Sequence, residues 1–290
     1  MKTNVCVFRL PIFTRMSLFT ASLNSGSNGN CYYVGNESDA ILVDAGLSCR
    51  ETEKRMRKLD LDIHRVKAIF ISHEHGDHIR GLPTLAHKYS IPVYITPTTA
   101  RYGPHLIGHL SVQFRDGEPV EIGSLTIHPF SKAHDAADPH SFVISSNGVH
   151  VGVFTDIGKV CDNLVYYFSQ CHAAYLEANY DEDMLEHGRY PIHLKNRIRN
   201  GEGHLSNRQA LELFMAHRPP HQTHLFLAHL SEQNNHPDKA LEAFALYQKD
   251  MHISVASRYE ASGLYHIRSN NTYPLRPKPS YLGRQMNLFH

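Results

Sequence analysis

The residues with the clearest potential for chemistry are the six from His73 to His78, which read His-Glu-His-Gly-Asp-His. Alternate residues of an extended turn point the same way, so His73 and His75 can bind one ion. Asp77 and His78 lie beyond the bend and can face a second ion. Zinc and similar metals accept this combination of imidazole and carboxylate ligands. The alternative is a solvated histidine-rich turn, because 23 of the 290 residues are histidine, but the H-x-H-x-D-H spacing favours a metal site.

The elements around this motif suit a functional site. The run Val66–Ser72 is apolar and β-branched, which predicts a buried strand, and Ile79–Tyr89 is predicted to be a helix. The histidines therefore follow the carboxyl end of a strand, where α/β proteins build ligand sites. The side chain of Glu74 points the other way, so we expect it to support a ligand or to face solvent.

Three further residues with metal-binding side chains are predicted at strand ends, namely His134, Asp156 and His229. Taken singly, each is explained as well by a cap or a hydrogen-bonded loop residue. Together with the motif they bring the number of candidate ligands to seven, which suits two divalent ions that share one carboxylate and a water.

The composition bounds the classes of function. An apolar content of 41%, a charged content of 20% and a net charge of +1 describe an ordinary globular protein without a global field for polyanions. Five scattered cysteines without a C-x-x-C pair favour a reducing, cytoplasmic compartment. No apolar run reaches the roughly 18 residues that span a bilayer, so we expect no membrane association.

The order of predicted elements indicates the architecture. Each half of the chain runs from strands to helices, and two sheets packed face to face with helices outside would bury all of them. We expect an N-terminal extension over residues 1–15, a catalytic domain over residues 16–268 and a proline-rich tail over residues 269–290. Within the domain, Pro237–Lys249 is predicted to form one helix.

In its motifs the chain resembles the metallo-β-lactamase-fold hydrolases. The resemblance rests on Asp44 in Val-Asp-Ala-Gly, on the H-x-H-x-D-H motif, and on the three strand-end residues in the same order. It implies a four-layer αββα sandwich. It also implies two metal ions, Zn²⁺ or Mn²⁺, one bound by His73, His75 and His134 and the other by Asp77, His78 and His229. Asp156 would bridge the two ions, and Asp44 would orient a ligand.

Further motifs resemble the WalJ/YycJ-type subgroup, which is associated with DNA exonuclease activity. They include Ser25–Cys31, His134–Pro139, Glu177–Asp181 and Gly203–Asn207. No β-CASP domain is inserted between Asp156 and His229, and no long exosite arm is obvious, which disfavours the mRNA- and tRNA-processing branches. The resemblance implies a nuclease acting in replication or repair, with DNA, single-stranded or nicked, as the partner. The alternative is a hydrolase of small esters, thioesters or lactones.

The phosphodiesterase members of this fold place a Glu–His pair where Glu177 and His204 stand in this chain. The pair implies that His204 either protonates the leaving oxygen or contacts a phosphate, while Asp77 binds metal and accepts a proton from the attacking water. The alternative is that Glu177 caps the next helix and that His204 starts one.

Two sets of residues could contact nucleic acid. The basic set is Lys195, Arg197, Arg199 and Arg208, and the aromatic set is Tyr180 and Tyr190. A solvated helix face and core-edge tyrosines are the alternatives.

The tail ends in Gln285-Met286-Asn287-Leu288-Phe289, which is similar to the peptide with which bacterial replication and repair proteins bind the sliding clamp. Gln285, Leu288 and Phe289 would be the anchors. The alternative is that Leu288 and Phe289 pack on the body of this protein.

Overall fold

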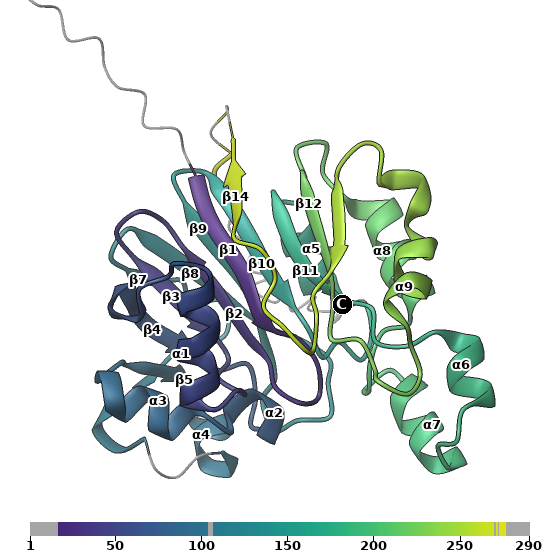
Figure 1. Cartoon of the computed structure of the whole chain (residues 1–290), viewed down its shortest axis with the longest axis horizontal. Helices are drawn as coiled ribbons and strands as arrows, with labels where there is room; N and C mark the ends of the chain where they lie inside the picture. Colours follow the sequence, from purple (N-terminus) through teal and green to yellow (C-terminus); the bar gives the residue numbers. More distant parts are fainter. Residues whose placement is uncertain (1–16, 104–106, 270, 272, 277–290) are drawn as a thin grey trace, which may run out of the picture.

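The computed structural model describes residues 17–103, 107–269, 271 and 273–276. Two mixed sheets lie face to face in it (Figure 1). The predicted N-terminal extension and the predicted clamp-binding residues Gln285, Leu288 and Phe289 lie outside the described residues. The boundaries of the three predicted regions therefore stay predictions.

The first sheet has the order β14-β1-β2-β3-β4-β5-β6. Its first and last strands in the sequence, β1 and β14, pair antiparallel. From β3 to β6 the neighbouring strands run parallel. The strands are β1 (Ser17–Asn24), β2 (Cys31–Gly35), β3 (Ala40–Val43), β4 (Val66–Phe70), β5 (Val93–Ile95), β6 (Ser111–Gln113) and β14 (Tyr265–Arg268).

The second sheet has the order β13-β12-β11-β10-β9-β8-β7. Strands β10 to β13 run parallel to one another, whereas β7 to β10 are antiparallel. The strands are β7 (Val120–Ile122), β8 (Leu125–Ser131), β9 (His140–Ser146), β10 (Val149–Phe154), β11 (Ala173–Glu177), β12 (His224–Ala228) and β13 (His252–Val255).

Helices cover the outer face of each sheet. The first sheet carries α1 (Cys49–Lys58), α3 (Leu82–Tyr89) and α4 (Pro97–Tyr102), and the second carries α5 (Asp162–Phe168), α8 (Asn207–His217) and α9 (Pro237–Ala243). Three more helices lie at the ends of strands, namely α2 (Gly76–Ile79), α6 (Glu182–His187) and α7 (Ile192–Arg199). Short 3-10 turns occupy Ile63–Arg65, Gly108–Leu110 and Ala245–Tyr247.

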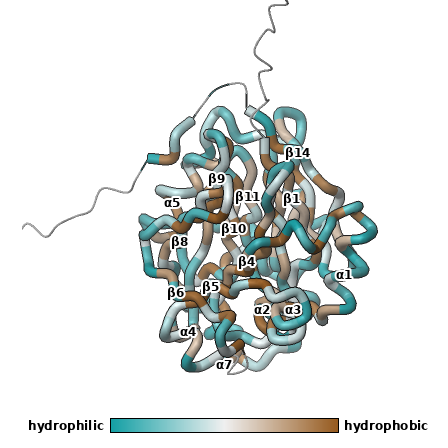
Figure 2. The backbone as a smooth tube through the Cα atoms, turned by 90° about the vertical axis from the view of Figure 1, so that its left-hand side faces the viewer, coloured by the Kyte–Doolittle hydropathy of each residue, from teal (hydrophilic) through white to brown (hydrophobic). Residues whose placement is uncertain are grey.

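The alternation of side chains along the strands creates three layers of core. In β11, Tyr175 packs between the sheets, while its neighbours Ala174 and Leu176 pack against the helices of the second sheet. In β2, Tyr32 lies between the sheets and Tyr33 faces the helices of the first. Strands buried on both faces read as continuous apolar runs, and Figure 2 shows the apolar residues gathered along the central strands. The predicted four-layer αββα sandwich is confirmed.

Two predicted helices are interrupted. The helix predicted over Ile79–Tyr89 is wrong at its start, because α2 ends at Ile79 and α3 begins at Leu82. The amide of Gly81 donates to the carbonyl of Ala45 (2.9 Å) instead of continuing the helix. The helix predicted over Pro237–Lys249 ends at Ala243 and is followed by a 3-10 turn.

Glycine permits the loop after β3 to approach the H-x-H-x-D-H motif. A Cβ atom on Gly46 would lie 1.6 Å from the carbonyl oxygen of Asp77, and one on Gly81 would lie 1.6 Å from the carbonyl oxygen of Leu47. The same carbonyl of Asp77 accepts a hydrogen bond from the amide of Asn30 (2.7 Å). Only residues without a Cβ allow this contact, so the loop fixes the backbone of the motif against the sheet.

No helix among the described residues is both long and apolar enough to cross a bilayer.

Candidate metal centre and active-site pocket

The predicted ligands come from both sheets. His73 follows β4, Asp156 follows β10, and His229 follows β12. Parallel pairing aligns the carboxyl ends of β10, β11 and β12, with Phe154 beside Leu176 and Glu177 beside Ala228. The two sheets therefore deliver their strand ends to one edge of the sandwich, as sequence reasoning expected.

The structure brings the seven predicted ligands together in overlapping groups. Donor atoms of His73, His75 and His134 all lie within 4.8 Å of one another, as do those of Asp77, His78 and His229. Asp156 lies between the groups, with Oδ2 3.2 Å from His78 Nε2 and Oδ1 3.8 Å from His134 Nε2. The grouping matches the two predicted ligand sets, and their binding of metal stays a prediction.

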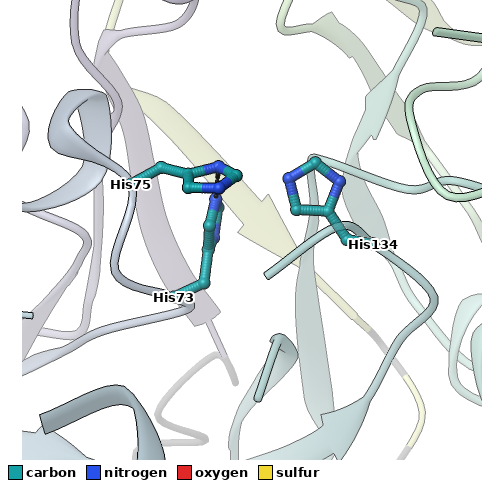
Figure 3. A group of neighbouring side chains, drawn as sticks. All are labelled: His73, His75 and His134. Atoms are coloured by element: carbon teal, nitrogen blue, oxygen red, sulfur yellow. Dashed lines mark hydrogen bonds between the residues drawn. The ribbon is translucent and has the colours of Figure 1, made fainter. Parts of the chain in front are cut away.

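Figure 3 shows the first group, in which the rings of His73 and His75 meet edge to face and His134 turns toward them. The Nε2 atom of His73 lies 3.1 Å from Nδ1 of His75. The lone pairs of two imidazole nitrogens at this distance repel each other unless a proton lies between them or a cation lies beside them.

The second nitrogen of most of these rings is already bonded. Nδ1 of His78 lies 2.7 Å from Asp44 Oδ2, and Nδ1 of His134 lies 3.0 Å from the Gly203 carbonyl. Nδ1 of His229 lies 2.9 Å from Glu177 Oε1. Each contact makes Nδ1 the donor and directs Nε2 to the centre, where its lone pair can bind a metal once the ring is neutral. This outer support is typical of metal-binding histidines.

Three residues of this region have left-handed backbone conformations that side chains rarely adopt. They are Asp44 (φ 61°), Asp156 (φ 54°) and His229 (φ 56°), and each directly follows a strand or lies one residue beyond it. Such conformations cost free energy and persist where the surroundings hold them. They turn the side chains back across the strand ends and toward the centre.

The centre fits divalent cations. Nε2 of His134, Nε2 of His229 and Oδ2 of Asp156 are buried and have no hydrogen-bond partner, although buried polar atoms are almost always paired. The donor set of imidazoles and carboxylates is one that Zn²⁺ and Mn²⁺ accept. These orphaned atoms lie among the candidate groups, so the residues present suit a pair of ions.

Burial and nearby charges shift the pKa values of the histidines at the centre in opposite directions. Burial holds the pKa of His73 well below its usual value. Burial also acts to lower the pKa of His229, but Asp156, Asp77 and Glu177 outweigh it and raise that pKa to about 10. Without ions, protons on histidines therefore offset the buried carboxylates, and metal binding would displace them.

Glu177 is fully buried next to the centre, and its carboxylate is hydrogen-bonded to several segments around it. Its Oε1 lies 2.9 Å from Nδ1 of both His204 and His229, and it accepts the backbone amides of Asp156 (3.1 Å), Ile157 (2.8 Å) and Leu205 (3.0 Å). Although burial raises the pKa of Glu177, His204 and His229 lower it to about 2.

In the structure Glu177 does not cap the next helix, and His204 does not begin one. Asp181 caps α6, and Ser206 caps α8 in a capping box with Gln209. His204 precedes that cap, and its side chain is 22% exposed on the wall of the pocket.

A cavity of about 240 Å³ opens over the centre. Its lining includes His75, Asp77 and His134 on one side and Tyr190, Arg197 and His204 on the other. The volume lies below the roughly 300 Å³ at which pockets for drug-sized ligands begin. The cavity therefore suits the reacting ester linkage and its immediate neighbours, and it is too small to enclose a large ligand as a whole.

Sequence reasoning missed several supporting residues. The Nδ2 of Asn30 lies 3.1 Å from Asp77 Oδ2 and 3.1 Å from His78 Nε2. Ser72 donates its amide and its hydroxyl to Asp44 (2.8 and 2.9 Å). Glu74, which was expected to support a ligand or to face solvent, accepts the amide of Ala137 (2.8 Å), so it ties the motif to the loop of His134. The only available signal for Asn30 was its place in the Ser25–Cys31 motif.

Comparison with known proteins places this arrangement in a family. A family model described as a β-lactamase superfamily domain matches residues 39–229. The chain is 36% identical over 250 residues to the exodeoxyribonuclease YycJ of Bacillus anthracis, across 84% of this chain and 94% of that protein. It is 32% identical over 219 residues to the exodeoxyribonuclease WalJ of Streptococcus pneumoniae, across 73% and 81% of the two chains.

A solved structure supports the same fold. The metallo-β-lactamase fold protein YhfI of Bacillus subtilis aligns with a TM-score of 0.66 at 15% identity, over 84% of this chain and 99% of that chain. The chain thus belongs to the β-lactamase superfamily, and it is an enzyme of the metallo-β-lactamase-fold hydrolases. Within that superfamily it is a relative of YycJ and WalJ, as its motifs predicted.

Proposed function

We propose that this protein is a dinuclear-metal phosphodiesterase that degrades DNA from an end, in the cytoplasm and in the service of replication or repair. The single observation that carries the proposal is the Glu177–His204 pair, set 2.9 Å apart at the wall of the pocket beside the seven candidate ligands. The names of the two exodeoxyribonuclease relatives support the choice of DNA.

Two divalent ions, when bound by the seven residues, would lower the pKa of a shared water and neutralise charge on a phosphate. His73, His75 and His134 would hold one ion, Asp77, His78 and His229 the other, and Asp156 both. The carboxylate of Asp77 is 18% exposed at the cavity and would take a proton from the attacking water.

His204 supplies the second proton transfer. Because Nδ1 of His204 is bonded to Glu177, Nε2 is the atom left to carry a proton into the pocket. His204 donates this proton to the departing oxygen, and the buried carboxylate of Glu177 stabilises the imidazolium form of His204. General acid catalysis of this kind contributes about 10²- to 10⁴-fold to a rate.

The test is an assay of the purified protein with Mn²⁺ or Zn²⁺ on single- and double-stranded DNA labelled at the 5′ or 3′ end, beside a chromogenic lactone and a thioester. We expect metal-dependent release of nucleotides from one end of DNA. Turnover of the lactone or the thioester with no cleavage of DNA would overturn the proposal in favour of a small-molecule hydrolase.

We further propose the sliding clamp as a partner of the tail, through Gln285, Leu288 and Phe289. The support is the similarity of this peptide to clamp-binding peptides. Deletion of residues 285–290 should abolish binding to the clamp and leave hydrolysis of free DNA intact. Clamp binding that survives the deletion would reject this partner.

A further inference from the structure

We propose that Arg197 and Tyr190 form the substrate-recognition wall of the pocket, with Arg197 on a phosphate that neighbours the cleaved one and Tyr190 on a nucleobase. The inference rests on the proposed function, because it specifies how a strand of nucleic acid would lie in that pocket.

The wall belongs to the α6–α7 segment, residues 181–203, which connects β11 to α8. In Figure 1 its two helices extend beyond the body of the sandwich. The segment has a small core of its own, in which Leu185 and Ile198 pack with Tyr180, and Tyr190 and Leu194 cover them. It lines the cavity with Tyr190, Leu194, Arg197, Ile198 and Gly203.

The structure separates Arg197 from the other basic candidates. Lys195 donates to the carbonyl of Glu186, and Arg199 pairs with the carboxylate of Glu186 (2.8 Å). Arg208 uses Nε, Nη1 and Nη2 on two glutamates. Of the four candidates, Arg197 is the one that lines the cavity. Arg199 and Arg208 belong to solvated ion pairs, and Lys195 is bonded to a backbone carbonyl.

Arg197 is tethered beside the metal centre. Its Nε donates to Asp135 Oδ2 (2.5 Å), its Nη2 contacts the same oxygen, and the other oxygen of Asp135 lies 3.4 Å from His134 Nε2. In the described part of the chain, Nη1 of Arg197 has no bonded partner, and the side chain is 59% exposed. A guanidinium oriented by a carboxylate and still carrying open donors suits a phosphate.

Tyr190 provides an aromatic surface on the same wall. Tyr180 is only 4% exposed and belongs to the small core, whereas Tyr190 is half-buried and faces the cavity beside Leu194 and Ile198. Stacking of a base on an aromatic side chain is sequence-tolerant, because every base has a π-face. A basic contact next to an aromatic one is the pattern of proteins that track a single strand.

The test compares Arg197→Gln with two matched controls, Arg199→Gln and Arg208→Gln. Each variant is assayed on a labelled single-stranded oligonucleotide over a series of salt concentrations and on bis(p-nitrophenyl) phosphate. That small diester has neither a neighbouring phosphate nor a base. Metal content and circular dichroism verify that each variant is folded and loaded.

We expect Arg197→Gln to raise KM for the oligonucleotide about 10-fold and to reduce the slope of log KM against log salt by about 0.7, the value for one contact with a single strand. Its kcat/KM ratio of oligonucleotide to small diester should fall about 10-fold, while the controls keep the ratio of the unmodified protein. Tyr190→Ala should raise KM about 5- to 100-fold, and Tyr190→Phe should restore most of the binding.

Equal losses on both substrates would reduce Arg197 to a structural role through Asp135 and overturn the inference. A KM no different from that of the controls would do the same. In both cases the unmodified protein still cleaves DNA, so the proposed function stands. If the unmodified protein cleaves neither DNA nor the small diester, the proposed function itself fails.

Discussion

Strands β10 and β11 have acidic residues at their carboxyl ends and histidines toward their amino ends. At their carboxyl ends lie Asp156 and Glu177, within the candidate metal centre. Toward their amino ends lie His150 and His172, which with His221 form a distal histidine cluster. Tyr273, in the first part of the predicted tail, stacks on His221 at 4.3 Å, and its carbonyl contacts Nε2 of His150.

The two clusters differ in their carboxylates. In the described residues no carboxylate bonds to the distal histidines, and burial lowers the pKa of His150 to about 4 and that of His172 to about 3. At the centre the pKa of His229 is instead raised to about 10, because nearby carboxylates outweigh burial. The number of histidines therefore does not distinguish a metal centre from a packed ring cluster, whereas the buried acids beside them do.

The largest expected effect that separates the clusters is on metal content. His75→Ala should remove bound metal and abolish nuclease activity, a loss of more than about 100-fold, because removing even an outer partner of a ligand costs 10- to 100-fold. Elemental analysis and end-labelled DNA assays measure both. Retention of full metal content and full rate by His75→Ala would show that the ligands are wrongly assigned.

The next-largest effect distinguishes the metal ligands from His204, the proposed proton donor beside them. His204→Ala should slow cleavage by about 10²- to 10⁴-fold with both ions still bound. Glu177→Gln should slow cleavage and also weaken metal binding about 10- to 100-fold, because Glu177 supports His229 and the loop of Asp156. If His204→Ala lost metal as fully as His75→Ala, His204 would be a ligand, which its place near Asp156 and His229 would permit.

A smaller effect is on stability in acid. The folded-state pKa values of His150 and His172 lie below the value of about 6.5 in the unfolded chain. Their contribution is therefore present above pH 6.5 and is lost as the pH falls from 6.5 through 4 toward 3. We expect the free energy of unfolding in urea to fall by several kcal/mol over that range, because each unit of pKa shift corresponds to about 1.4 kcal/mol, and to fall less in His172→Asn. An equal acid loss in His172→Asn would contradict this origin.

The metal-free centre should have the opposite dependence on pH. The pKa of His229 is raised above its unfolded value, so its contribution is present below pH 6.5 and is lost as the pH rises through about 10. The metal-free protein should therefore lose stability on the alkaline side, and bound Zn²⁺ or Mn²⁺ should remove that loss. Urea unfolding between pH 7 and 10, with and without metal, measures it, and identical curves would contradict the interpretation.

The smallest effect is that of His221→Ala. Loss of its stacking on Tyr273 should lower the free energy of unfolding by about 1 kcal/mol. Metal content and cleavage rate should stay within twofold of the unmodified protein, because the distal cluster lies at the other end of the strands. A loss of metal in this variant would mean that the two clusters are not independent.

The sequence predicted the parts of the site that depend on local order. The β-branched run before His73 and the alternate spacing of His73 and His75 depend on neighbours in the chain, so periodicity identified them. The layers followed from the order of the elements, because each half runs from strands to helices and two packed sheets with helices outside would bury them.

What sequence reasoning could not predict depends on contacts between distant segments. The break at Gly81 arises because its amide bonds to Ala45, some 36 positions earlier. Asn30 joins the centre through Asp77 and His78, and Arg197 differs from Arg199 in its pairing with Asp135 and in lining the cavity. No local pattern encodes such pairings, since each depends on how the loops meet at the sheet edge.

The most direct test of the account is anomalous diffraction from crystals of this protein grown with Mn²⁺. We expect two anomalous peaks in each chain, one among His73, His75 and His134 and the other among Asp77, His78 and His229, with Asp156 in contact with both. Peaks confined to other surfaces, or no peak at the strand ends, would contradict it.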